Sequence, residues 1–130
     1  MRATALFALI LAAGIGTAAA AEPIAGTWRT EADRKGQKGH VEVTACGSGW
    51  CGTIVSVETA DGAPVTTPNI GRQVLIGMAA EGGGRYRGEV FVPIMGANFA
   101  AEATVRGSQL ALRACNAVGI CRNQTWLRMN

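Results

Sequence analysis

Apolar and polar residues alternate in short segments along most of the chain after residue 22. A period of two, interrupted by Gly, Asn, Asp and Pro, is typical of half-buried β-strands, whereas no sustained 3.6-residue apolar period indicates a helix. A long connection is expected over 60–71, which holds two prolines, and a turn over 79–84. The pattern predicts strands over residues 24–30, 40–46, 51–59, 72–78, 85–92, 97–106, 109–115 and 121–129.

The predicted strands follow one another as hairpins, without an evident long crossover. A closed sheet hides the strand edges that such a chain would expose, so the sequence predicts an all-β, small antiparallel up-and-down barrel of about eight strands. A two-sheet sandwich is the alternative. A barrel of this size is wide enough to be filled by its own side chains or to hold one small ligand. The small residues Ala101, Ala103 and Ala111, expected to point inward, favour space for a ligand.

The start of the chain has the organisation of a signal peptide. Arg2 precedes an apolar run over 3–15, and Ala19–Ala21 supply the small residues that signal peptidase requires, so cleavage is expected before Glu22. The apolar run is shorter than the roughly 20 residues of a membrane span, and a retained N-terminal anchor is the alternative. The chain is therefore expected to comprise a signal peptide, residues 1–21, and a single β-barrel domain, residues 22–130, located in the periplasm or secreted.

The charge of the chain bears on its partners. Without Arg2 the chain carries 11 basic and 9 acidic residues. This excess of positive charge is too small to bind the phosphate backbone of a nucleic acid, and an exported protein does not encounter the chromosome. Nucleic acid is therefore not expected as a partner, nor is stable membrane insertion, and a monomer is expected. Residues 34–40 form a basic segment whose default role is solvation, with contact to anionic envelope polymers or lipid headgroups as the alternative.

Four cysteines occur as two close pairs, Cys46 with Cys51 and Cys115 with Cys121. Zinc ribbons favour C-x2–4-C spacing, which the first pair meets only at its upper limit and the second exceeds, and thioredoxin-type chemistry needs C-x-x-C at a helix N-terminus. An even number of cysteines in an oxidising compartment indicates disulfides, and each pair stands where a strand meets a loop. Local pairing is favoured, while connections from Cys46 to Cys115 or to Cys121 stay open.

Several short motifs occur in a characteristic order: GTW at 26–28, C…GWCGTIV at 46–55, GRYRGEVFVP at 84–93 and C…CRNQTWLR at 115–128. This ordered set resembles the bacterial domain of unknown function 2147, a family of small exported proteins, over essentially the whole chain after the signal peptide. The resemblance implies a compact, mainly antiparallel β-barrel and no established activity. The chain departs from the family pattern at Thr67-Pro68-Asn69, where Asn-Pro-Asp is usual, and at 93–99, where the apolar PIMGANF replaces a polar cluster.

The Gly26-x-Trp28 start is also similar to the opening of lipocalins, in which a Trp closes the bottom of the barrel under a basic side chain from a late strand. This resemblance implies structural roles for Gly26, Trp28, Trp126 and Arg128. It also implies a cation–π contact, either between Trp28 and Arg128 or between Trp126 and Arg29.

Known catalytic motifs are missing from the sequence. It contains no Gly-x-Ser-x-Gly elbow, no phosphate-binding glycine loop and no histidine-rich metal cluster, and the single histidine, His40, is expected to be solvent-exposed. An enzyme is therefore not expected, and no catalytic residue, cofactor or metal ligand is assigned.

Two functions of different class are consistent with the sequence. The first is a non-enzymatic exported binding module that holds a small apolar or amphipathic ligand in or at the mouth of the barrel. In the second, the chain binds an envelope protein, for example as an inhibitor of an envelope hydrolase, or serves as a structural protein of the envelope. Loops closed by disulfides suit binding because they lose little entropy when they bind. The candidate binding residues are Trp50, Met95 and Phe99. Trp50 is expected to be exposed in the first cysteine loop, with packing over the disulfide as the alternative.

Overall fold

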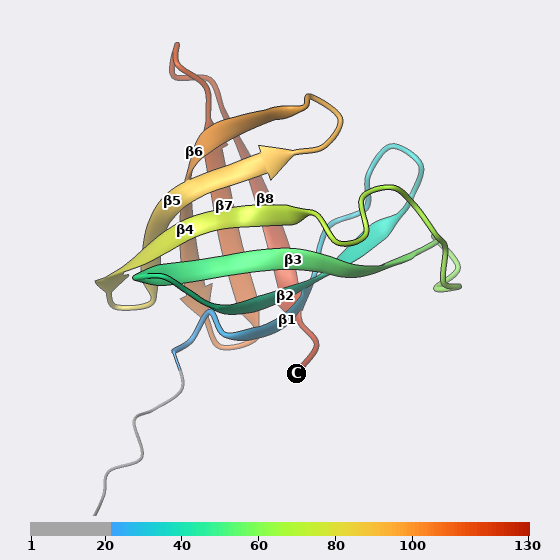
Figure 1. Ribbon diagram of the computed structural model, residues 1–130, viewed down its shortest axis with the longest axis horizontal. Helices are drawn as coiled ribbons and strands as arrows, with labels where there is room; N and C mark the ends of the chain where they lie inside the picture. The colour runs from blue at the N-terminus through green and yellow to red at the C-terminus, as the bar shows by residue number, and fades with distance from the viewer. Residues whose placement is uncertain (1–21) are drawn as a thin grey trace, which may run out of the picture.

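The computed structural model describes residues 22–130, and the predicted signal peptide lies outside them (Figure 1). Eight antiparallel strands are hydrogen-bonded in sequence order and close on themselves, which confirms the up-and-down barrel and excludes the two-sheet sandwich. Within the described range, no helix is long and apolar enough to cross a membrane. The strands are β1 (Gly26–Arg29), β2 (Lys38–Cys46), β3 (Gly49–Glu58), β4 (Gln73–Gly82), β5 (Arg85–Val92), β6 (Ala97–Arg106), β7 (Gln109–Cys115) and β8 (Cys121–Arg128).

Strands β5, β6 and β7 begin and end where the alternation predicted. Strand β4 is longer than predicted, because residues 79–82 continue to pair with β5 and the turn is confined to Gly83 and Gly84. Both glycines have positive φ, 64° and 78°, a conformation that residues with a side chain rarely adopt. The connection over 60–71 is long, as expected, and an isolated bridge between Glu58 and Pro64 holds its start against the end of β3.

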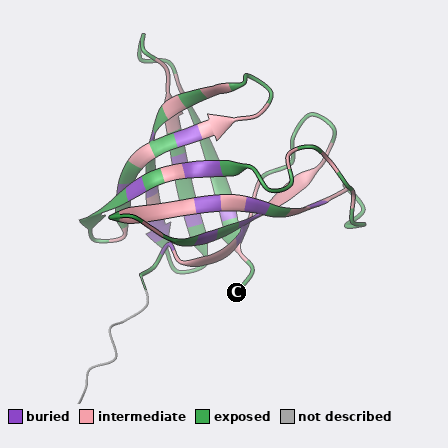
Figure 2. Ribbon diagram, in the orientation of Figure 1, coloured by how far each residue is buried: buried purple, intermediate pink, exposed green. Residues whose placement is uncertain are grey.

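Side chains from the inner faces of the strands form one core inside the barrel. Buried positions recur at every second residue along most strands, so buried and more exposed bands alternate in Figure 2. The bulkiest core residues, such as Trp28, Tyr86 and Met78, are at most 2% exposed. The core consists of Ile24, Trp28, Val41, Val43, Ile54, Val57, Val74, Leu75, Met78, Tyr86, Val90, Ala101, Ala103, Val105, Leu110, Leu112 and Trp126.

The glycines of the inner face allow neighbouring strands to pack closely. Gly52 of β3 is buried, and a Cβ added there would lie 2.7 Å from Val41 Cγ1 and 3.1 Å from Leu75 Cβ. A Cβ added to Gly88 of β5 would lie 2.7 Å from two carbonyl oxygens of β4. Carbon atoms in contact are usually about 3.5–4.0 Å apart, so neither position has room for even one methyl group.

The alanines do not open a ligand-sized lumen. Ala101 and Ala103 lie in the core and are 3% and 0% exposed. The expectation that Ala111 points inward is wrong, because Leu110 and Leu112 occupy the inner face of β7 and Ala111 is exposed on the outer face. The interior is therefore filled by protein over most of its depth.

One end of the barrel, here called the closed end, carries Glu22, the C-terminus and the short turns 47–48, 83–84 and 107–108 (Figure 1). The guanidinium of Arg128 stands 4.2 Å from the centroid of the Trp28 ring and donates hydrogen bonds to the carbonyl oxygens of Ala25 (2.9 Å) and Pro23. The Trp28 indole Nε1 donates to the carbonyl of Ile24 at 2.9 Å. The segment before β1 is thereby fastened under the barrel.

Two further residues complete the closed end. Gly26 has φ of 125°, and a Cβ there would lie 2.6 Å from the carbonyl oxygen of Asn130, so only glycine fits. The Tyr86 hydroxyl donates to Glu22 Oε2 at 2.6 Å. Burial of the phenol, together with this hydrogen bond, raises the pKa of Tyr86 to about 12.

Both disulfides join neighbouring strands. Cys46 pairs with Cys51 and Cys115 with Cys121, with Cα–Cα distances of 5.7 and 4.0 Å. Local pairing is confirmed, and the connections from Cys46 to the second pair are wrong. The first disulfide links β2 to β3 at the closed end. The second links β7 to β8 at the opposite end, here called the open end, which carries the connections 30–37, 59–72, 93–96 and 116–120.

Candidate functional site

The seam that closes the barrel between β1 and β8 is short. β1 pairs with β8 only at Trp28–Arg128 and Arg29–Leu127, although β8 extends back to Cys121. No strand in residues 22–130 pairs with the β1-facing edge of β8 over 121–126. The barrel wall therefore stops early on this side, and the inner face of β8 is open to solvent towards the open end.

Two polar residues occupy this uncovered inner face. Trp126 is buried in the core, and Gln124 and Arg122, two and four positions earlier on the strand, share its face. Their partners on β7 agree with this placement, since Leu112, opposite Gln124, is 6% exposed, and Ala114, opposite Arg122, packs against the core. Both polar residues are exposed, because no side chain from β1 covers them.

Apolar side chains lie on the inner face at the same end of the barrel. Val92, Phe99 and Ala114 are half-buried at the open ends of β5, β6 and β7 and pack against the core. Phe99 stands opposite Val90, which is 5% exposed, so its side chain is on the inner face of β6. We use the term mouth for the residues Val92, Phe99, Ala114, Arg122 and Gln124.

The mouth combines an apolar side with unused hydrogen-bond donors. Gln124 Oε1 accepts a hydrogen bond from the Trp126 indole at 2.8 Å, which orients the amide and leaves its NH2 group available. Arg122 makes no ion pair with any described residue. A small molecule could therefore place an apolar part against Phe99 and Val92 and an oxygen-bearing group against β8.

The three predicted binding residues do not form one site. Phe99 belongs to the mouth, and Met95, 65% exposed, lies in the turn just above it. Trp50 lies on β3 at the closed end, half-buried and packed against the core, so the expectation that it is exposed is wrong. Its neighbour Cys51 points to the other face of the strand, because successive side chains alternate.

The sequence pattern does not identify Arg122 and Gln124 as candidate site residues. Four successive polar residues, 122–125, conceal the alternation at the start of β8, although counting back in twos from Trp126 identifies both as inner-face positions. The early end of β1, which exposes them, depends on pairing between the two ends of the chain and has no local signal.

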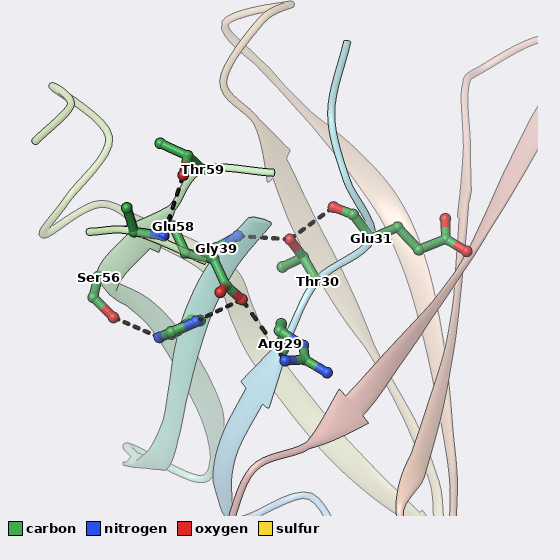
Figure 3. Close-up of polar contacts among 9 residues, drawn as sticks. Arg29, Thr30, Glu31, Gly39, Ser56, Glu58 and Thr59 are labelled. Atoms are coloured by element: carbon green, nitrogen blue, oxygen red, sulfur yellow. Dashed lines mark hydrogen bonds and ion pairs between the residues drawn. The ribbon is translucent and has the colours of Figure 1, made fainter. Parts of the chain in front are cut away.

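A second polar cluster lies on the outer face of β1, β2 and β3 and was also missed (Figure 3). His40 Nδ1 lies 2.7 Å from the Ser56 hydroxyl and His40 Nε2 lies 3.1 Å from Glu58 Oε1, and both pairs are hydrogen-bonded. Arg29 Nη1 is 3.8 Å from the same carboxylate oxygen, so the alternative contact of Arg29 with Trp126 does not form. The hydrogen bond from His40 is the main cause that lowers the pKa of Glu58.

His40 is therefore half-buried, and the expectation that it is solvent-exposed is wrong. Its contact with Ser56 depends on a register shift between His40 and Val41, which the sequence pattern does not reveal. The order hydroxyl, imidazole and carboxylate is also found in hydrolases, but such a site needs donors for an oxyanion and a substrate pocket beside the hydroxyl. The cluster lies on a sheet surface, and its evident effect is to tie three strands together.

The outer surface also carries shallow depressions and ion pairs. Two shallow depressions, of about 280 and 240 Å³, lie on the outer face of β5 and β6, where Arg87 forms ion pairs of 2.7 Å with Glu81 and Glu102. Among residues 22–130, no cluster of three or more His, Cys, Asp or Glu side chains is arranged to hold a metal ion.

The chain belongs to the bacterial family DUF2147, described as an uncharacterized protein conserved in bacteria, whose model matches residues 26–128. None of the curated proteins matches the chain. The structure is similar to that of protein HP1028 from Helicobacter pylori, described as belonging to the lipocalin family, with a TM-score of 0.65, 16% sequence identity and 82% of each chain covered. At this identity the likeness establishes a lipocalin-like barrel. The two disulfides and the bacterial family indicate an extracytoplasmic protein.

Proposed function

We propose that the protein is a periplasmic binding protein that holds a small amphipathic molecule at the mouth of its barrel. The observation that carries this proposal is the solvent-exposed inner face of β8, where Arg122 and Gln124 lie at the same end of the barrel as the inner-face apolar residues Val92 and Phe99. A lipocalin-like barrel is consistent with small-molecule binding, and the position of the opening indicates where the molecule would bind.

Binding deep inside the barrel is disfavoured by packing. Trp28, Leu75, Met78 and Leu110 are each 0% exposed, and the Gly52 position has no room for a methyl group. Displacing such side chains would cost more than the ligand could recover, because well-packed cores are as dense as organic crystals. The partly exposed apolar side chains of the inner faces of β5, β6 and β7 lie at the mouth.

The composition of the mouth favours an amphipathic molecule with an anionic head. Val92, Phe99 and Ala114 offer apolar atoms that remain partly wet, so covering them removes apolar surface from water. Arg122 provides a charge without an acidic partner among the described side chains, and Gln124 adds two N–H donors. A carboxylate or sulfonate on an aromatic or aliphatic body fits both halves.

Fluorescence titration with the anionic apolar dye anilinonaphthalene sulfonate tests this proposal. Arg122→Gln should weaken binding about tenfold or more, since a hydrogen bond to a charged group contributes roughly 1.5–3 kcal/mol. Phe99→Ser should also weaken it. Arg113→Gln is the matched control, because Arg113 lies one residue from Ala114 on the outer face of β7 and should leave binding unchanged.

Equal effects of Arg122→Gln and Arg113→Gln would show that the dye responds to surface charge rather than to the mouth. No measurable binding by the intact protein would also count against the proposal. A protein partner is the other function that the sequence allows, but Trp50, its main candidate contact, is packed against the core.

A further inference from the structure

The backbone of β8 faces β7 and β1 with alternate residues. The N–H group of Arg128 donates to the carbonyl oxygen of Ser108, in the turn that precedes β7, whereas the N–H group of Met129 donates to that of Thr27 in β1. Backbone groups of successive residues in a strand point to opposite sides. Because β8 pairs with β7 without a register shift, its odd-numbered residues direct their N–H and C=O groups towards β1.

Three of these odd-numbered residues have no backbone partner. β1 is much shorter than β8 and ends at Arg29, opposite Leu127 (Figure 1). Within residues 22–130, no backbone hydrogen bond reaches Cys121, Asn123 or Thr125 from that side. We call residues 121–125 the free edge of β8. It is about 17 Å long at about 3.4 Å per residue, and both Asn123 and Thr125 are exposed.

The arrangement of these groups selects an extended polypeptide as their partner. Donors and acceptors that alternate along a line are matched by the backbone of another strand. The free edge contains no proline, and its pairing with β7 has no bulge, so two common features that block strand addition are missing from it. Charge does not make this choice, because the connections at the open end carry both signs. Their charged residues are Glu31, Asp33, Arg34, Lys35, Asp61 and Arg72.

We propose that the free edge of β8 binds an extended segment of another polypeptide as an additional antiparallel strand. The segment continues the line of β1, shares its direction and extends the barrel wall where β1 ends. Its residues opposite Cys121, Asn123 and Thr125 exchange backbone hydrogen bonds with β8. This binding goes beyond the proposed function, because it depends on the backbone of β8 rather than on side chains of the mouth.

The side chains of β8 set a preference within the bound segment. Two of its residues point inward, one opposite Arg122 and one opposite Gln124. Arg122 makes no ion pair with any described residue, so an acidic side chain fits opposite it and a basic one is repelled. The position opposite Gln124 is nearer to the buried Trp126 and suits a β-branched apolar residue. An inward charge on an edge strand also discourages pairing with wholly apolar strands.

A second copy of the chain fits the free edge less well than a single segment. In the symmetric antiparallel arrangement, Asn123 would pair with Asn123 of the copy, and Leu127 would stand opposite Gly119 of the copy. Arg29 of β1 already occupies the place opposite Leu127, so the turn of the copy would collide with β1. The two Arg122 side chains would also share one inner face. A single extended segment meets neither obstacle.

Amide NMR spectroscopy of the isotope-labelled protein, without its predicted signal peptide, tests this proposal. The probe is the peptide Thr-Val-Thr-Glu-Thr, acetylated and amidated, in which valine is placed opposite Gln124 and glutamate opposite Arg122. We expect saturable shifts at Cys121, Asn123 and Thr125, and slower hydrogen exchange of these three amides when the peptide is bound. No binding of the peptide by the original chain would overturn the proposal.

Two N-methylated forms of the peptide are matched to each other. Methyl groups on the amides of its third and fifth residues remove donors that face β8 and should weaken binding about tenfold or more. Methyl groups on the amides of its second and fourth residues face away from β8 and should leave binding nearly unchanged. Equal losses, or a larger loss in the second form, would overturn the proposal.

A pair of protein variants separates this proposal from the proposed function. Asn123→Pro removes one N–H group of the free edge, where proline is tolerated, whereas Asn123→Ala keeps it. Only Asn123→Pro should weaken peptide binding, by about fivefold or more. Both variants should bind anilinonaphthalene sulfonate normally, because Asn123 points away from the mouth. Circular dichroism spectra establish that the variants are folded, and the methylated peptides test the proposal on the original chain.

Two further outcomes would assign the free edge to another occupant and overturn the proposal. Slow exchange of the Cys121, Asn123 and Thr125 amides in the monomeric protein without peptide would show that the chain covers its own edge. Dimers in sedimentation velocity, formed under conditions that protect the same amides, would show that a second copy covers it.

Discussion

Gly52→Ala tests how tightly the interior of the barrel is filled. The new methyl carbon would lie 2.7 Å from Val41 Cγ1 and 3.1 Å from Leu75 Cβ, nearly an ångström inside the usual contact distance. Val41 and Leu75 are both 0% exposed, so neither side chain can rotate into solvent. The strain of an extra methyl group in such a core is about 1–3 kcal/mol, which lowers the melting temperature by roughly 5 °C or more for a domain of this size.

The assay is equilibrium urea unfolding followed by tryptophan fluorescence, with Gly39→Ala as the matched control. Gly39 lies in the neighbouring strand β2, and a Cβ there would meet only the Thr30 side chain, at an ordinary 3.7 Å. This control should be neutral or stabilising by up to about 1 kcal/mol, because alanine restricts the unfolded chain. If Gly52→Ala were as well tolerated as Gly39→Ala, the interior would contain unused space and the argument against a ligand inside the barrel would fail.

Three further predictions concern polar contacts. Tyr86 is the only tyrosine, so the phenolate absorbance of the folded protein should appear near pH 12. The free energy of unfolding should fall above about pH 10, because the unfolded chain loses the phenolic proton first. A folded-state titration midpoint at about pH 10 would contradict the burial of this hydroxyl. The lowered pKa of Glu58 contributes stability that is complete above about pH 4–5 and is lost as the pH falls through the pKa of the folded state. The melting temperature should therefore depend more steeply on pH in the acid range for the original chain than for Glu58→Gln. Equal slopes of melting temperature against pH would show that His40 does not hold the carboxylate. Arg128→Met removes the cation–π contact with Trp28 and two hydrogen bonds to carbonyl oxygens, so the free energy of unfolding measured in urea should fall by about 2–4 kcal/mol. A loss below about 1 kcal/mol would mean that Arg128 does not close the barrel.

The fold could be predicted because its signals are local. Alternation in 85–92, 97–106 and 109–115 gave strand boundaries that match the structure, since each inner-face side chain must be apolar to enter the core. The two cysteine pairs could be assigned because strand ends across a hairpin bring Cβ atoms together. The three glycines of 79–84 predict a turn over that whole segment, yet residues 79–82 pair with β5 and lengthen β4.

The candidate site could be predicted only in part because it depends on contacts between distant segments. Phe99 was identified from its apolar surroundings, but the role of Arg122 follows from the early end of β1, at the opposite end of the chain. The contact of His40 with Ser56 depends on a register shift that no residue pattern marks. Ala111 was assigned to the wrong face because size alone does not indicate direction.

Amide NMR spectra of the isotope-labelled protein, recorded during titration with anilinonaphthalene sulfonate, are the most direct test of the account. They show whether a small molecule binds at the mouth or inside the barrel. Saturable shifts should concentrate at the mouth, at Val92, Phe99, Ala114, Arg122 and Gln124, while the buried residues Trp28, Leu75 and Met78 keep their positions. Shifts concentrated at those buried residues, with the mouth unaffected, would contradict a filled barrel that binds its ligand at the open end.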